Sequence, residues 1–194
     1  YKTVSINHLG DWGTQFGKLI YAYKTWGSRE EVEAKGVPEL TRLYVKFHEE
    51  AEQHPEMEDE GRRWFKAIED GNAEALELFN WFKELTLRDA KPVYDLLGVQ
   101  FDSYNGESFY VDKTDRVVEE LREKNLLTIS DGASVVDLDE EKSGMPPCLI
   151  LKKDGTTIYA TRDIAAALYR KETYDCDKCL YVVAYQPDLH FSQW

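Results

Sequence analysis

The sequence has few cysteines and no long hydrophobic run. Three cysteines are an odd number, which gives no disulfide framework and fits a reducing cytosol. No apolar stretch approaches the roughly 20 residues that a membrane-spanning helix needs, and no secretion signal is visible. These absences exclude a disulfide-stapled secreted domain and a helical membrane protein, and we expect a cytoplasmic location.

Positive charge is also scarce, because 24 Lys and Arg stand against 37 Asp and Glu, for a formal net charge of −13. A nucleic-acid clamp takes most of its affinity from a basic surface. We therefore do not expect the chain to hold nucleic acid by itself or to dock on anionic membranes. The 42% hydrophobic content is enough for a buried core, and the length of 194 residues predicts one domain, or one domain that carries an insertion.

Strand-like and helix-like patterns alternate in the two outer parts of the chain. Strands are expected at 2–6, 99–102, 108–111, 133–138 and 179–184, and helices at 14–25, 115–124 and 164–169, the last with Thr161 as its N-cap. Asp154-Gly155 predicts a tight hairpin turn. The run 179–184 is almost entirely apolar, which is typical of a strand buried on both faces of a parallel sheet. The alternation predicts an α/β fold, an open and incomplete parallel sheet with helices on both faces.

The middle of the chain has helical periodicity instead. Three groups of apolar residues recur at helical spacing, and Pro55 and Gly71 separate them: Leu40, Leu43, Tyr44 and Phe47; Trp64, Phe65 and Ile68; Leu76, Leu78, Phe79, Phe82 and Leu85. The acidic run 49–60 is interpreted as a solvated face or loop. We therefore expect a first α/β part at 1–36, a helical insertion at 37–98 and a second α/β part at 99–194.

Ligands of open parallel sheets bind at the carboxyl ends of the strands, and three such ends carry polar residues. At one of them Tyr159 precedes Asp163, which falls in the first turn of the next helix. Asp163 either complements the helix dipole or pairs with a cation, and the two roles are compatible. A guanidinium would make two parallel hydrogen bonds that an ammonium group cannot match. Tyr159 by itself is interpreted as an edge or core tyrosine, and its hydroxyl gains functional weight only beside Asp163.

The first of the other two strand ends carries Asn7, His8 and Asp11. The second carries Tyr185, Gln186 and Asp188, with His190 and Gln193 on the helix that follows. Gln186 is either a turn residue or an amide that recognises a ligand. His8 and His190 are interpreted as local hydrogen-bonding residues, because no partner has the spacing of a zinc site. No metal site is predicted.

Two further motifs are weak. Cys176-Asp-Lys-Cys179 has C-x-x-C spacing, but only Cys148 remains, so a zinc knuckle lacks its second pair. A thioredoxin-like pair lies at a helix start, whereas this pair precedes a predicted strand. The glycines of the stretch 9–17 match neither the dinucleotide fingerprint nor the Walker pattern.

Several stretches together resemble one family, the class I arginyl-tRNA synthetases. They are Asn7-His-Leu-Gly-Asp-Trp-Gly-Thr-Gln-Phe-Gly17, Leu96-Leu-Gly-Val-Gln-Phe-Asp102, Gly106-Glu-Ser-Phe-Tyr110, Asp131-Gly-Ala133, Tyr159-Ala-Thr-Arg-Asp-Ile-Ala165 and Tyr181-Val-Val-Ala-Tyr-Gln-Pro-Asp-Leu-His-Phe-Ser-Gln193. The resemblance implies a Rossmann-like (HUP-type) fold and an enzyme that activates arginine with ATP and magnesium and then passes it to tRNA(Arg).

The resemblance also implies roles for single residues. Tyr159, Asp163 and Gln186 match the positions that contact the substrate arginine, with the aspartate on the guanidinium side. His190 and Gln193 match residues near the nucleotide. No residue is expected to act as an acid or a base, because adenylate formation depends on positioning and charge stabilisation.

Two ATP motifs of the family lie outside the sequence. The His-x-Gly-His signature is expected before Tyr1, and the KMSKS-like loop after Trp194. We therefore expect a central fragment that is inactive in isolation, with no tightly bound cofactor, whose parent contacts tRNA mainly through other domains. The alternatives are a non-catalytic arginine-binding module and a purely structural or interaction role for the insertion.

Overall fold

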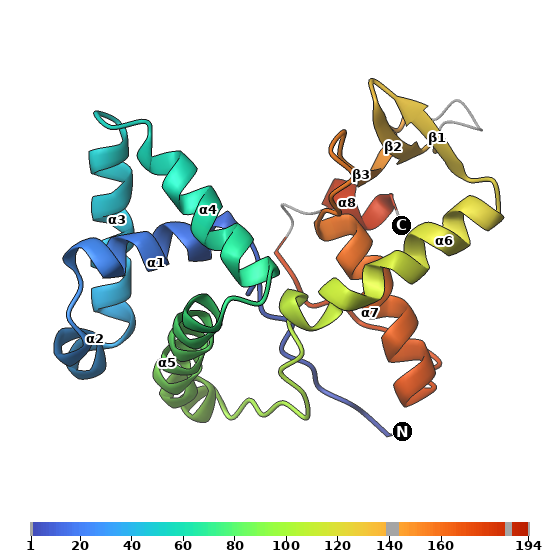
Figure 1. Cartoon of the computed structure of the whole chain (residues 1–194). Helices are drawn as coiled ribbons and strands as arrows, with labels where there is room; N and C mark the ends of the chain where they lie inside the picture. Colours follow the sequence, from blue (N-terminus) through green and yellow to red (C-terminus); the bar gives the residue numbers. More distant parts are fainter. Residues whose placement is uncertain (1, 139–143, 185–187, 194) are drawn as a thin grey trace. The chain divides into compact units, whose positions relative to one another are not determined.

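The computed structural model describes residues 2–138, 144–184 and 188–193. The chain divides into two compact units, one formed by Asp11–Phe101 and the other by Tyr1–Gly10 together with Asp102–Trp194 (Figure 1). Among the described residues, every helix is too short or too polar to cross a membrane.

The unit Asp11–Phe101 is entirely helical in its regular structure. Its helices are α1 (Thr14–Trp26), α2 (Arg29–Lys35), α3 (Val37–Ala51), α4 (Met57–Glu69) and α5 (Ala73–Leu97). Local signals set the ends of α5, because the Asn72 side chain accepts a hydrogen bond from the Ala75 N–H and Gly98 adopts a left-handed conformation after the last turn. The helices expected from periodicity between 37 and 97 are confirmed.

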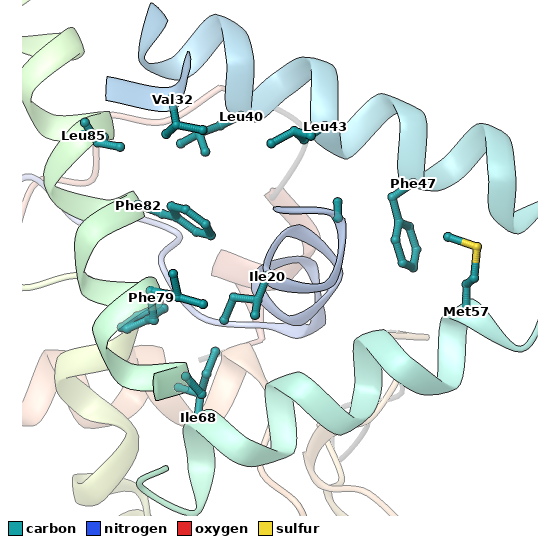
Figure 2. Packing of buried hydrophobic residues seen from close by; sticks show 13 residues of the cluster. Ile20, Val32, Leu40, Leu43, Phe47, Met57, Ile68, Phe79, Phe82 and Leu85 are labelled. Atoms are coloured by element: carbon teal, nitrogen blue, oxygen red, sulfur yellow. The ribbon is translucent and has the colours of Figure 1, made fainter. Parts of the chain in front are cut away.

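The core of this unit is built from the apolar faces of its helices. Ile20 of α1, Phe47 of α3 and Phe82 of α5 are almost completely buried and converge in one cluster (Figure 2). Aromatic rings meet edge to face around it, as Phe16 and Phe79 do at 5.0 Å between ring centroids. Burying these side chains supplies the main driving force that holds the helices together.

Helices α1 and α4 approach each other closely where glycines face one another. A Cβ atom placed on Gly17 would lie 2.0 Å from the carbonyl oxygen of Gly61 and 2.6 Å from the backbone nitrogen of Phe65. Only glycine allows two helix backbones to come this near. The last glycine of the stretch 9–17 therefore has a packing role.

The second unit combines a small antiparallel sheet with helices. Its elements are the 3-10 helix η1 (Glu107–Lys113), α6 (Thr114–Glu123), β1 (Leu127–Ser130), β2 (Ala133–Val136), β3 (Cys148–Leu151), α7 (Tyr159–Tyr174) and α8 (Asp188–Ser192). The strands lie in the order β1-β2-β3, and both pairs are antiparallel. The buried residues Val118, Cys148, Ile150 and Ala160 pack together between the sheet and the helices.

Several strand predictions for this unit are confirmed. The strand expected at 133–138 is β2, and the turn at Asp154-Gly155 forms, with the Lys152 N–H donating to the Thr156 carbonyl at 2.9 Å. Leu151 and Thr157 then pair as an antiparallel bridge.

Other predictions for this unit are wrong. The segment 108–111 lies in η1, and 179–184 forms no strand, with Val182 97% exposed. A short apolar run does not distinguish strand from helix, and a strand also needs a hydrogen-bonded neighbour. The expected parallel sheet is accordingly not seen among the described residues, where the strands are antiparallel. The segments expected as strands at 2–6 and 99–102 form none; one isolated parallel bridge joins Ile6 to Ser103, the residue after 99–102.

Helix α7 begins earlier than expected. Tyr159 is its first residue and Ile158 its N-cap, so Thr161 does not cap it and Asp163 lies beyond the first turn. Thr161 is instead fully buried, and its hydroxyl donates to the Ile150 carbonyl at 2.6 Å. This bond joins the start of α7 to the end of β3, so packing rather than capping decides where the helix begins.

Candidate functional site

Asp163 of α7 lies at the centre of a cluster of polar side chains that come from several segments of the chain. Its side chain is 20% exposed. The Oδ1 atom lies 3.1 Å from His8 Nε2, and the Oδ2 atom lies 2.7 Å from His190 Nε2. An ionised carboxylate only accepts hydrogen bonds, so both imidazoles donate to it.

Electrostatics keep this carboxylate ionised. Burial by itself would raise the pKa of the Asp163 carboxyl, but the hydrogen bonds from His8 and His190 outweigh burial and hold the pKa below its ordinary value. A carboxylate offers about four acceptor positions, and the two histidines occupy one on each oxygen. The remaining positions suit a ligand with two parallel N–H donors.

Arg170 fixes the protonation of His8. Its Nη2 atom lies 3.0 Å from His8 Nδ1. A guanidinium has only donors, so in this shorter contact Nδ1 accepts and Nε2 carries the proton that faces Asp163; the Asn105 carbonyl oxygen lies farther from Nδ1, at 3.4 Å. Arg170 is only 8% exposed, and its guanidinium lies over the rings of Tyr110 and Tyr181, at 5.9 and 5.6 Å. A buried cation is thereby connected to a buried anion through the His8 ring.

Backbone and ionic contacts hold the loop that carries His8. The Asn7 N–H donates to the Ser103 carbonyl and the Glu107 N–H donates to the Leu9 carbonyl, both at 2.9 Å. The Arg162 Nε atom donates to the Glu107 carboxylate at 2.9 Å, and both side chains are largely buried. Arg162 is the residue before Asp163, so this ion pair ties the His8 loop to the turn of α7 that presents the carboxylate.

Tyr159 and Asp163 are four residues apart on α7 and therefore share one face. Tyr159 is 53% exposed, and its ring meets the His190 ring edge to face at 4.9 Å between centroids. The structure thus brings Tyr159, Asp163 and His190 together. Gln193 donates instead to the carbonyls of Pro146 and Pro147, at 2.9 and 3.3 Å. Gln186 lies outside the described residues.

Sequence reasoning missed His8 and Arg170 as members of the cluster. His8 is interpreted from the sequence only as a local hydrogen-bonding residue. The signal that could have found it is its place at the polar end of a predicted strand, like that of Asp163. Arg170 follows Asp163 by seven positions on the same helix, which is two turns and therefore the same face. Asp11 has a different environment, since it is buried and pairs with Lys83 of α5 at 2.5 Å.

The cluster suits an organic cation, held by hydrogen bonds to the Asp163 carboxylate, better than a coordinated metal ion. In the ranges that the structure describes, no group of three histidine, cysteine or acidic side chains is arranged to hold a metal ion. The Nε2 atoms of both histidines point at carboxylate oxygens and are used in hydrogen bonds. The chemistry on offer is a desolvated negative charge with a tyrosine beside it.

Comparison with known proteins links this geometry to a family. Residues 1–194 match the family model described as tRNA synthetases class I (R), catalytic domain. The arginine–tRNA ligase of Clostridioides difficile (strain 630) is 62% identical over 194 residues, and that of Exiguobacterium sp. (strain ATCC BAA-1283 / AT1b) is 61% identical over 193 residues. Each alignment covers 100% of this chain and 34% of the relative, so the chain spans about a third of their length.

Solved structures show the same likeness. The arginyl-tRNA synthetase of Plasmodium falciparum superposes with a TM-score of 0.81 at 25% identity, over 98% of this chain and 32% of that one. A putative arginyl-tRNA synthetase from Campylobacter jejuni shares the fold alone, with a TM-score of 0.54 at 16% identity over 99% of this chain and 50% of that one. Since the family model matches every position of the sequence, this chain belongs to the catalytic-domain family of the class I arginyl-tRNA synthetases.

Proposed function

We propose that this chain is the central part of the catalytic domain of a cytoplasmic arginine–tRNA ligase, and that Asp163 holds the guanidinium group of the substrate arginine. The complete enzyme joins arginine to ATP, releases pyrophosphate and transfers the arginyl group to tRNA(Arg). The family match and the 62% identical ligase support the activity. The observation that supports the site is the ionised, largely buried Asp163 carboxylate, which accepts one hydrogen bond on each oxygen, from His8 and from His190.

Asp163 selects arginine through charge and shape. A guanidinium donates two parallel hydrogen bonds to one carboxylate, and low exposure to water strengthens the pairing. His8 and His190 hold the carboxylate from its other acceptor positions, so it meets the ligand already oriented. Tyr159 supplies a hydroxyl on the same face of α7, and Gln186 provides an amide that an incorrect amino acid leaves unpaired.

The chemical step needs no acid or base from these residues. The arginine carboxylate attacks the α-phosphorus of ATP, and the enzyme contributes mainly by holding the reactants in line. His190 and Gln193 lie on the nucleotide side in this proposal, and magnesium enters with ATP as part of the substrate. Contacts with tRNA are made mainly by other domains of the ligase.

The proposal includes an arrangement of domains. Residues 1–36 and 99–194 belong to the Rossmann-like catalytic domain, and 37–98 form its helical insertion. In the complete enzyme the segments 2–6 and 99–102 are strands of a parallel sheet. The parallel bridge between Ile6 and Ser103 supports this arrangement.

Substitution of Asp163 by Asn in the full-length ligase tests the site. Asn keeps the shape and removes the charge, and loss of one partner of a buried charge pair costs about 2 kcal/mol or more. We expect the Kd for arginine, measured by calorimetry, to rise about 30-fold or more. The Kd for citrulline, which is nearly isosteric with arginine and uncharged, is expected to rise much less in the same variant.

Asp175→Asn is the matched control, because Asp175 ends the same helix with a side chain that is 94% exposed. It is expected to leave arginine binding unchanged. An Asp163→Asn variant with the parent Kd for arginine would disprove the guanidinium site. Arginine-dependent exchange between ATP and pyrophosphate by the full-length protein separates a ligase from a non-catalytic binding module.

A further inference from the structure

The C-x-x-C motif, which the proposed function leaves unused, brings two thiols into contact. Cys176 Sγ and Cys179 Sγ lie 3.4 Å apart in the segment that follows α7. Cys176 is partly exposed and Cys179 is exposed, whereas Cys148 is buried in β3. We propose that Cys176 and Cys179 form a redox modification site, a dithiol that closes to an intramolecular disulfide by exchange with a low-molecular-weight disulfide.

The geometry requires only a small movement. The S–S bond of a disulfide is about 2.0 Å long, so the two sulfur atoms must approach by about 1.4 Å from their present separation of 3.4 Å. Cys176 is held at the end of α7, where its carbonyl accepts a hydrogen bond from Lys171 Nζ at 3.1 Å and its thiol lies 4.0 Å from the Arg170 carbonyl.

The partner thiol lies on a weakly packed segment. Beyond Cys179 the chain runs through Leu180 and Val182, which are 77% and 97% exposed. Tyr181 between them contacts the Arg170 guanidinium, but the exposed Leu180 and Val182 add little packing that would oppose a shift of Cys179 towards Cys176. One anchored thiol and one movable thiol are the arrangement that ring closure needs.

The surroundings of Cys179 favour its thiol over its thiolate. The motif follows the C-terminal end of α7, where the helix dipole opposes negative charge. Burial and the neighbouring Cys176 thiol also raise the pKa of the Cys179 thiol. The pair is thus unlike a thioredoxin site, where a helix N-terminus stabilises the attacking thiolate, and we expect its exchange to be slow but driven forward by the adjacent thiol.

The exchange balances in two steps. The thiolate of one cysteine attacks a sulfur atom of oxidised glutathione, which forms a mixed disulfide and releases one glutathione thiol. The second cysteine then attacks the protein sulfur of that mixed disulfide and releases the second glutathione thiol. The protein loses two hydrogen atoms, and one glutathione disulfide becomes two thiols.

Peptide mapping of the full-length protein tests the site. The protein is incubated with oxidised glutathione without oxygen, acid-quenched, alkylated and digested with trypsin. Lys178 lies between the two cysteines, so trypsin separates them and the disulfide appears as two peptides joined through sulfur. We expect this joined pair in the parent protein and its conversion to separate alkylated peptides after reduction.

Variants assign the sulfur atoms. Cys176→Ser and Cys179→Ser are each expected to lose the joined peptides completely and to carry glutathione on the remaining cysteine. Cys148→Ser is the control and is expected to form the pair as the parent does. Alkylation of both thiols in the parent, or glutathione on both without joined peptides, would overturn the proposal. If a variant fails to fold, peptide mapping of the parent protein alone still tests the proposal. The disulfide measurement does not depend on arginine binding, so its failure is distinguishable from failure of the proposed function.

Discussion

Substitution of Gly17 by Ala tests the close approach of α1 and α4. In an ordinary helix interior the change would stabilise the protein by about 0.8–1 kcal/mol, because alanine is the better helix former. Here the new methyl group would lie 2.0 Å from the Gly61 carbonyl oxygen and 2.9 Å from the Phe65 Cβ atom. The atoms on the far side are mostly backbone and cannot rotate away, so the two helices must separate.

The balance of these terms predicts net destabilisation. Overpacking a tight contact costs about 1–3 kcal/mol, and a clash with backbone belongs at the upper end. Separating α1 from α4 also loosens the packing around Ile20, which is fully buried beside this contact. After subtraction of the helix-propensity gain, we expect Gly17→Ala to destabilise the helical unit by about 1–2 kcal/mol.

Hydrogen–deuterium exchange of the full-length protein measures this effect locally. Peptides that cover α1 and α4 are expected to exchange roughly ten times faster, since about 1.4 kcal/mol corresponds to a tenfold change in the opening equilibrium. Gly61→Ala is the matched control on the same helix pair. Its methyl group would meet the flexible Lys18 Cγ atom at 2.8 Å and backbone only at 3.4 Å, so the variant should be close to neutral. Equal protection of both variants would refute the reasoning.

Two further predictions concern the carboxylate cluster. Arg170→Met removes the donor to His8 Nδ1 and with it the orientation of the imidazole on Asp163. We expect the KM for arginine in ATP–pyrophosphate exchange to rise about tenfold or more, from the roughly 1.5–3 kcal/mol of a charged hydrogen bond, with kcat little changed. Arg170→Lys is expected to restore part of the loss, and an unchanged KM in Arg170→Met would rule out this role. The pKa of Asp163 is lowered in the folded protein, so its contribution to stability is complete above the unfolded pKa of about 3.9 and disappears as the pH falls through the lower folded value. Asp163→Asn should therefore flatten the decline of melting temperature in acid, and an identical decline in the variant would contradict the assignment.

Periodicity predicted the helical unit well because helices are local. The spacing of Leu40, Leu43 and Phe47 places them on one face of α3, and all three are buried. Strands were predicted less reliably, because their partners lie far away in the sequence. The apolar run 179–184 matched a buried strand, yet Leu180 is 77% exposed, since no neighbouring strand is paired with it in the described part of the chain.

The candidate site divides in the same way. Tyr159 and Asp163 were found because they were expected at the end of a strand and in the first turn of the next helix, where a hydroxyl and a carboxylate lie close together; the structure places them on one face of α7 instead. The contact of His8 with Asp163 was not predicted, because the two residues lie 155 positions apart and no local pattern encodes a contact over that separation. The lowered pKa of Asp163 depends on this contact and was likewise not predictable.

The sequence by itself determined the apolar faces of the helices, the acidic character of the chain and the resemblance to its family, because these depend on residue identity and short-range spacing. Tertiary structure alone decided that two imidazoles hold the Asp163 carboxylate, that Arg170 sets the proton of His8, and that Gly17 meets the backbone of α4. Such contacts join residues far apart in the chain, and only the packing of whole elements brings their atoms within hydrogen-bonding or van der Waals distance.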